Sequence, residues 1–150
     1  MKKFAPLVAL GVAALVVSGV ATGATHARSK TKMTFTAVLN IGQEKPVPKG
    51  AKSGATGKFT ATVNGTSVTW KLTFSHLTGP ATAAHIHSGK KGVAGPVIVP
   101  LCGPCTSPAS GTGTLTAAQL AEMKAGTTYV NVHTAKNAGG EIRGQIKVSM

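Results

Sequence analysis

The chain has 150 residues, of which 16 are Lys or Arg and only three are acidic, so its formal net charge at pH 7 is +13. The lack of aspartate and the scarcity of glutamate disfavour calcium sites and the paired carboxylates of glycosidases. A protein this basic attracts anionic partners non-specifically, such as cell-surface polymers or phospholipid headgroups. A specific nucleic-acid partner is not expected.

Residues 1–27 have the layout of a secretory signal peptide. Two lysines precede an apolar stretch at residues 4–17, and small residues then lead to Ala24 and Ala27, after either of which cleavage is expected. The apolar stretch is short for a spanning helix, and an uncleaved membrane anchor is the alternative. We therefore expect residues 28–150 to form one domain that is secreted or held at the cell surface. Its contact with the membrane would be limited to the signal segment before cleavage.

Short segments of alternating polarity predict an all-β domain in the first half of the exported part. Strands are expected at residues 33–40, 57–63 and 67–74, with a Pro/Gly/Lys loop at 41–54. The dipeptide at 64–65 is Asn-Gly, which favours a tight turn and makes the last two strands a hairpin. The residues expected to face inward are Phe35, Ala37, Leu39, Phe59, Ala61, Val63, Val68, Trp70, Leu72 and Phe74.

The second half continues the alternation of strands and turns. The expected strands are residues 83–87, 97–101, 127–134 and 140–148, and residues 102–113 are expected to form a loop. Seven or eight strands with one short helix near residues 116–125 predict an antiparallel sandwich or barrel closed by long Greek-key connections.

One segment has a helical pattern. Thr116 and Gln119 have the spacing of a capping box, and Gly126 suits the end of a helix. Leu120 and Met123 would form its buried stripe.

Three histidines are the strongest candidates for chemistry. Strand periodicity places His85 and His87 on one face of their strand, opposite Ala84 and Ile86. The same alternation aligns His133 with Tyr129 and Asn131, opposite two valines. If the aliphatic faces point to the core, all three imidazoles point away from it.

Such a pair plus a third imidazole from another strand is a geometry that binds Cu²⁺ or Zn²⁺. Glu141 follows the loop after His133 and is a candidate fourth ligand, or an acceptor that fixes a histidine tautomer. The alternative is that the histidines bond only to one another, to Glu141 and to strand carbonyls. His76 is expected to be a turn residue.

The segment CGPC, from Cys102 to Cys105, has the spelling of a thioredoxin-type redox site. That chemistry requires the first cysteine at the N-terminus of a helix, where the pKa of its thiol falls. A proline and two glycines soon follow Cys105, so no helix is expected there. We predict a structural disulfide that staples a loop of an exported protein.

Three segments of the chain resemble the CHRD domain, a module named for chordin that is widespread in exported bacterial proteins. They are AHIH at residues 84–87 with the Gly-rich turn after it, YVNVHT at 129–134, and GEIRGQ at 140–145. The similarity extends over about residues 34–148. It implies a β-sandwich or barrel, immunoglobulin-like or akin to copper-zinc superoxide dismutase, in an extracellular role without an established enzymatic activity.

Three functions remain open after this resemblance. The first is an exported, non-catalytic binding or structural module whose partners are anionic surface polymers or other extracellular proteins. The second is a copper or zinc protein that uses the three histidines, and the third is a disulfide oxidoreductase. Dismutase activity is disfavoured because the histidines are too few for a bridged dinuclear site and aspartate is lacking.

Overall fold

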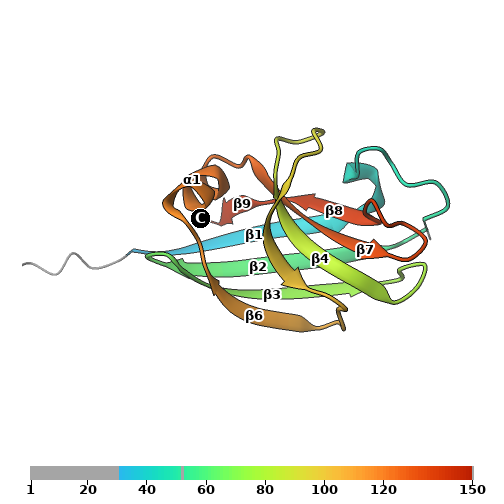
Figure 1. The fold of residues 1–150 in the computed structure, drawn as a ribbon, viewed down its shortest axis with the longest axis horizontal. Helices are drawn as coiled ribbons and strands as arrows, with labels where there is room; N and C mark the ends of the chain where they lie inside the picture. The colour runs from blue at the N-terminus through green and yellow to red at the C-terminus, as the bar shows by residue number, and fades with distance from the viewer. Residues whose placement is uncertain (1–30, 52, 150) are drawn as a thin grey trace, which may run out of the picture.

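A computed structural model describes residues 31–51 and 53–149 of the chain (Figure 1). The predicted signal peptide lies outside these residues. Within them, no helix is long and apolar enough to span a membrane. The elements are β1 (Lys32–Asn40), the 3-10 turn η1 (Ile41–Gln43), β2 (Thr56–Asn64), β3 (Ser67–Ser75), β4 (Ala81–Ser88), β5 (Val97–Cys102), β6 (Ala109–Thr114), α1 (Ala117–Lys124), β7 (Thr128–Thr134), β8 (Ile142–Gln145) and β9 (Lys147–Ser149).

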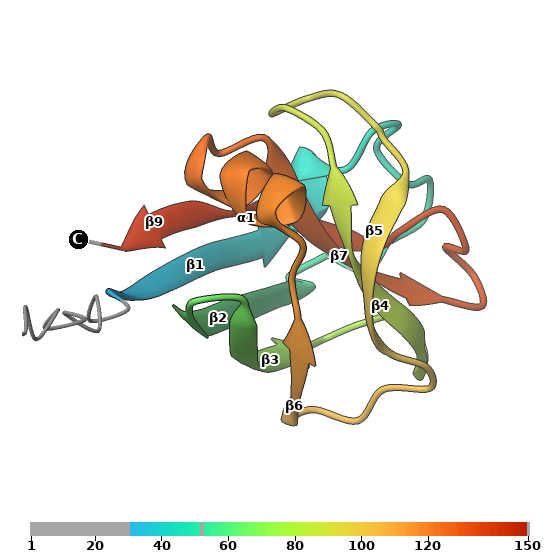
Figure 2. The ribbon, with the colours of Figure 1, turned by 60° about the vertical axis from the view of Figure 1, so that its left-hand side comes forward.

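All of these strands belong to one antiparallel sheet with the order β5-β4-β7-β8-β1-β2-β3-β6, and β9 pairs with β1. The sheet curls into a nearly closed barrel whose two edge strands are β5 and β6 (Figure 2). Because β3 and β4 are not neighbours in the sheet, the chain crosses over between them, and it crosses again from β6 through α1 to β7. The predicted all-β antiparallel fold with one short helix is confirmed.

The predicted hairpin of β2 and β3 is confirmed in its register. Asn64 pairs with Ser67, which leaves a two-residue turn whose first residue, Gly65, has a φ of +64°. That left-handed backbone favours glycine, and a positive φ at this position matches the twist of the strands. The residues predicted to face inward are buried, except Phe74, which is only partly covered.

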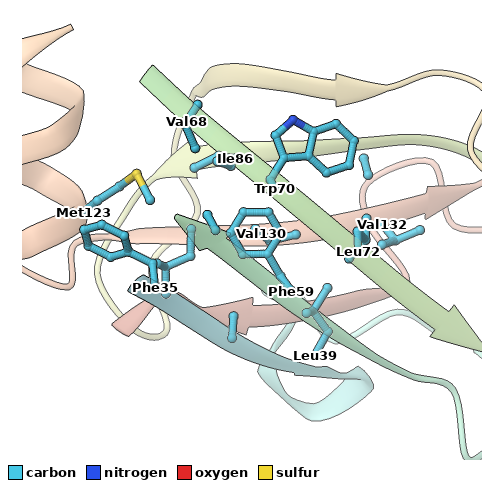
Figure 3. Close-up of a cluster of buried hydrophobic side chains, with 14 of the residues drawn as sticks. Phe35, Leu39, Phe59, Val68, Trp70, Leu72, Ile86, Met123, Val130 and Val132 are labelled. Atoms are coloured by element: carbon cyan, nitrogen blue, oxygen red, sulfur yellow. The ribbon is translucent and has the colours of Figure 1, made fainter. Parts of the chain in front are cut away.

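The core lies between the β1–β3 half of the barrel and the aliphatic faces of β4 and β7. Figure 3 shows Phe35, Phe59 and Trp70 from the first half beside Ile86 and Val130 from the second. Because Ile86 and the two valines of β7 fill the interior, the histidines that alternate with them lie on the outside of the barrel wall. The prediction for both aliphatic faces is therefore confirmed.

Helix α1 begins and ends as its sequence predicts. Thr116 and Gln119 form a capping box, with the Gln119 amide donating to Thr116 Oγ1 over 3.1 Å. Gly126 has a φ of +67° after the last turn. Met123 is fully buried against the core and Leu120 is partly covered. The helix lies at the end of the barrel near β9 (Figure 2).

The predicted loop at residues 102–113 is wrong in its second part, because β6 pairs there with β3. The sequence of β6 has no alternating apolar residues, because the Trp70 side chain from β3 fills the space on this side of the barrel. A Cβ atom on Gly111 would lie 2.7 Å from Trp70 Cζ2, so only a residue without a side chain fits. The expected strand at 140–148 is also divided, at the buried Ile146, into β8 and β9.

Candidate metal centre

The pairing of β4 with β7 brings the three histidines together. His85 lies opposite Asn131 and His87 opposite Tyr129, while His133 lies opposite Ala83. His133 is therefore the diagonal neighbour of His85 on the outer face, at a separation that long side chains bridge. We call His85, His87 and His133 the histidine cluster.

One ring nitrogen from each histidine lies within 4.8 Å of the others. The closest pair is His85 Nδ1 and His133 Nε2, which are 3.1 Å apart. Tetrahedral zinc with Zn–N bonds near 2.05 Å holds its ligand nitrogens about 3.3 Å apart. The His85–His133 pair is already close to that spacing, and the other nitrogens, within 4.8 Å, must move closer to hold such an ion. Three nitrogens leave a fourth coordination position open.

Backbone carbonyl oxygens determine which nitrogen two of these rings present. His87 Nδ1 donates to Gly95 O and His133 Nδ1 donates to Ala138 O, each over 2.9 Å. Because a carbonyl oxygen only accepts, the proton of each neutral ring lies on Nδ1, and Nε2 carries a lone pair. The same arrangement orients histidines that ligate metals.

His87 is only 8 % exposed, and its Nε2 has no hydrogen-bond partner. An unsatisfied buried acceptor costs about 1–3 kcal/mol. This nitrogen is the group in the cluster that a metal ion would satisfy most directly.

The environment favours neutral imidazoles at the other two positions. Burial, followed by repulsion from His133 and His87, lowers the pKa of His85 below its ordinary value. Burial also lowers the pKa of His133, although the hydrogen bond to Ala138 opposes that shift. Metal ligation requires the neutral ring, so both shifts favour it.

The structure does not bring Glu141 to the histidine cluster. Its carboxylate accepts hydrogen bonds from the backbone and hydroxyl of Thr78, at 2.7 and 2.6 Å, from the Thr134 hydroxyl at 2.7 Å, and from the Asn137 amide at 3.0 Å. Strand alternation does not determine its direction, because β8 begins one residue later and Gly140 has a φ of +125°. Glu141 joins the turn after β3 to the loop after β7.

The outer face carries a stack of rings that the sequence did not single out. The His87 and Tyr129 rings are nearly parallel, with centroids 4.8 Å apart, and Arg143 Cζ lies 3.4 Å from the Tyr129 centroid. Since β7 lies between β4 and β8, the phenol ring is sandwiched between the imidazole and the guanidinium. The alternation of β7 placed Tyr129 on this face, but its two neighbours follow only from the strand order.

The loop after β1 covers part of this outer face. Glu44 is 3 % exposed, and burial raises the pKa of its carboxyl to about 7 against the attraction of Arg143 and hydrogen bonds from Lys45 and Asn131. Glu44 belongs to an irregular segment, so no periodicity indicates its position. The histidine end of the face is more open, because His85 and His133 are only partly buried.

Cys102 and Cys105 form the predicted disulfide. Cys105 also donates its backbone N–H to Ala81 O over 3.0 Å, which holds the turn against the start of β4. The chain continues from this turn into β6, and in the described residues no helix begins at either cysteine. The disulfide therefore crosslinks a loop, and neither cysteine lies at a helix N-terminus that would lower the pKa of its thiol.

His76 lies outside the histidine cluster, as predicted. It is exposed at the end of β3, has a φ of +59°, and places Nδ1 3.0 Å from Ser75 Oγ.

Comparison with known families agrees with these features. The family model of the CHRD domain matches residues 35–146, which run from β1 through β8 and include all three histidines of the cluster. Searches of curated proteins and of solved structures found no significant match. The match covers most of the chain and every strand except β9, with β1 from Phe35 onward. The chain therefore belongs to the CHRD domain family.

Proposed function

We propose that the protein is an exported, non-catalytic binding module that holds a copper or zinc ion at His85, His87 and His133. The observation that carries this proposal is the convergence of three imidazole nitrogens within 4.8 Å on one face of two paired strands. Imidazole suits both metals, and three neutral ligands leave a position for water or for a group of a partner.

The hydrogen bonds around the histidine cluster support metal binding over a purely structural role. A structural cluster would satisfy its buried nitrogens internally, but His87 Nε2 is buried without a partner. The carbonyl oxygens of Gly95 and Ala138 hold two rings in the tautomer that a metal at Nε2 requires. In the metal-free protein, His85 Nδ1 donates to His133 Nε2; the ion would replace that proton.

A role outside the cell is supported by the sequence of residues 1–27 and by the oxidised cysteine pair, since disulfides persist in oxidising compartments. The excess of lysine suits contact with anionic cell-surface polymers. N-terminal sequencing of protein recovered from the culture medium tests this part. We expect a start after Ala24 or Ala27, and retention of residue 1 in a membrane fraction would contradict it.

Titration of the purified protein with Cu²⁺ and with Zn²⁺ tests the metal site. We expect saturation near one equivalent, and a loss of affinity of about 100-fold or more in His133→Ala, because a ligand and its bridging hydrogen bond are removed together. His76→Ala is the matched control, since it removes an exposed imidazole outside the cluster. A lack of binding at micromolar metal, or equal loss in both variants, would overturn the proposal.

A further inference from the structure

A second concave site lies beside β8, on the far side of Tyr129 from the histidine cluster. It is a small cavity of about 140 Å³ between η1, the loop that joins β4 to β5, and β8. We call it the cationic cavity. Its lining residues are Gly42, Gln43, Lys45, Lys91, Gly92, Arg143 and Gln145.

The charged residues that line this cavity all have the same sign. Lys45 and Lys91 are exposed at its rim, whereas Arg143 is 1 % exposed in the wall. No acidic residue lines it. Of the two glutamine amides in the lining, Gln145 Nε2 already donates to Gly89 O and Gly126 O. Gln43 Nε2 donates to Val38 O and keeps one further N–H.

Arg143 lacks a carboxylate partner that would explain its burial. In the described part of the chain its guanidinium donates, through Nη2, only to the uncharged oxygens Lys90 O, Val93 O and Gln145 Oε1, at 3.0, 2.9 and 3.5 Å. Its Nη1 is buried without a partner. A buried cation is costly unless an anion and further hydrogen bonds compensate it.

Glu44 compensates Arg143 only in part. The pKa of Glu44 is raised to about 7, so near neutral pH a large fraction of its carboxyl groups is protonated. Its Oε1 is also buried without a hydrogen-bond partner, so this atom and Arg143 Nη1 do not pair directly. The guanidinium therefore keeps both charge and donors for another anion.

We infer that the cationic cavity binds a tetrahedral oxyanion, phosphate or sulfate, with Arg143 in the wall and Lys45 and Lys91 at the rim. Arg143 Nη1 keeps its N–H groups for such oxygens, because the Nη2 protons go to Lys90 O and Val93 O. A cavity of this volume admits one such group.

An adjoining groove leaves room for the rest of a larger ligand. It has a volume of about 430 Å³, runs along β1 and β9, shares Gln43, Lys91 and Gln145 with the cationic cavity, and adds Lys147. The oxyanion is therefore either a free ion or a substituent of a cell-surface polymer, and both sources present the same chemistry.

Titration of the purified protein with sodium phosphate and sodium sulfate, at constant ionic strength set with chloride, tests the site by calorimetry and by amide chemical shifts. We expect saturable binding that the double variant Lys45→Gln/Lys91→Gln weakens about tenfold, because it removes two charges from the rim. The matched control is Lys71→Gln/Lys124→Gln, which removes two exposed charges from β3 and α1. Arg143→Lys, which keeps the charge but removes the unpartnered Nη1 donors, should also weaken binding.

The same titration with polyphosphate and with dextran sulfate separates the two sources. Affinity per oxyanion at least about tenfold above that of the free ion identifies a polymer ligand, and equal affinity identifies the free ion. Binding should persist in His133→Ala, which separates this site from the metal proposal. The inference is overturned if no saturation occurs at constant ionic strength, or if both double variants lose affinity equally, since net charge alone would then explain binding.

Discussion

Single hydrogen bonds determine the chemistry that each side chain of the outer face can perform. Carbonyl oxygens hold the Nδ1 protons of His87 and His133. Both rings therefore present an Nε2 lone pair before any ligand binds. His85 differs, because its Nδ1 contacts another imidazole and its tautomer can change. At this scale His85 is the adaptable ligand and the other two are preorganised.

The lowered pKa values of His85 and His133 predict how acid affects the metal-free protein. The folded state binds fewer protons than the unfolded chain between the lowered values and the ordinary value near 6.5. Stability should therefore fall as pH decreases through about 6.5 and further below it. Urea unfolding of wild type and His85→Ala at several pH values measures this dependence. A wild-type stability that rises as the pH is lowered through this range would contradict the lowered pKa values.

Glu141 should contribute to stability rather than to metal binding. We expect Glu141→Gln to cost about 2 kcal/mol or more, because the amide cannot accept from Thr78, Thr134 and Asn137 together. Burial alone would raise the pKa of this carboxyl, but these hydrogen bonds outweigh it and lower the pKa. Its contribution is thus present above the ordinary carboxyl pKa and is lost as pH falls through the lowered value.

Urea unfolding at neutral and acidic pH measures this effect. Glu122→Gln makes the same change at a carboxyl whose Oε2 has no hydrogen-bond partner, and we expect it to have little effect. Loss of metal affinity in Glu141→Gln at unchanged stability would contradict the structural role.

At the scale of elements, β7 contributes residues to both the inner and the outer face of the barrel wall. Val130 and Val132 face the core, while Tyr129, Asn131 and His133 face outward. The strand pairs with β4 on one side and β8 on the other, so its outer residues meet the histidines on one edge and Arg143 on the other. The candidate metal site and the cationic cavity therefore share one supporting strand.

Strand β6 needs a glycine at position 111, because the Trp70 ring fills the space where a side chain would lie. We expect Gly111→Ala to cost about 1–3 kcal/mol, because the new Cβ would lie 2.7 Å from Trp70 Cζ2. Gly113→Ala in the same strand is the control, since its Cβ would lie 3.7 Å from Val68 Cγ1, an ordinary contact. Chemical unfolding of both variants provides the comparison, and equal losses would refute this account of β6.

At the scale of the whole molecule, the barrel brings together segments that are far apart in sequence. His85 and His133 are 48 residues apart, yet they meet across adjacent strands. A ligand that joins them should stabilise the folded state, because the unfolded chain does not hold the three nitrogens together.

We therefore expect metal binding to raise the free energy of unfolding. At a free metal concentration 100 times the dissociation constant, the increase should be about 2.7 kcal/mol. Thermal unfolding with and without Zn²⁺, reversed by a chelator, measures it. His76→Ala should retain the increase and His87→Ala should lose it; an increase of the same size in His87→Ala would contradict binding at the cluster.

The sequence by itself determined the alternation of each regular strand, and with it the side of the barrel wall on which the histidines lie. It also determined the helix ends and the cysteine pair, because capping, turn formation and a four-residue ring are local properties. The tertiary structure decided the rest. Glu141 lies outside the alternation of β8 and turns to Thr78, and β6 forms where the Trp70 side chain fills the core. Glu44 lies in an irregular segment close enough to Arg143 for their charges to attract. Periodicity encodes which way a strand residue points, whereas partners from distant segments depend on the strand order of the closed barrel.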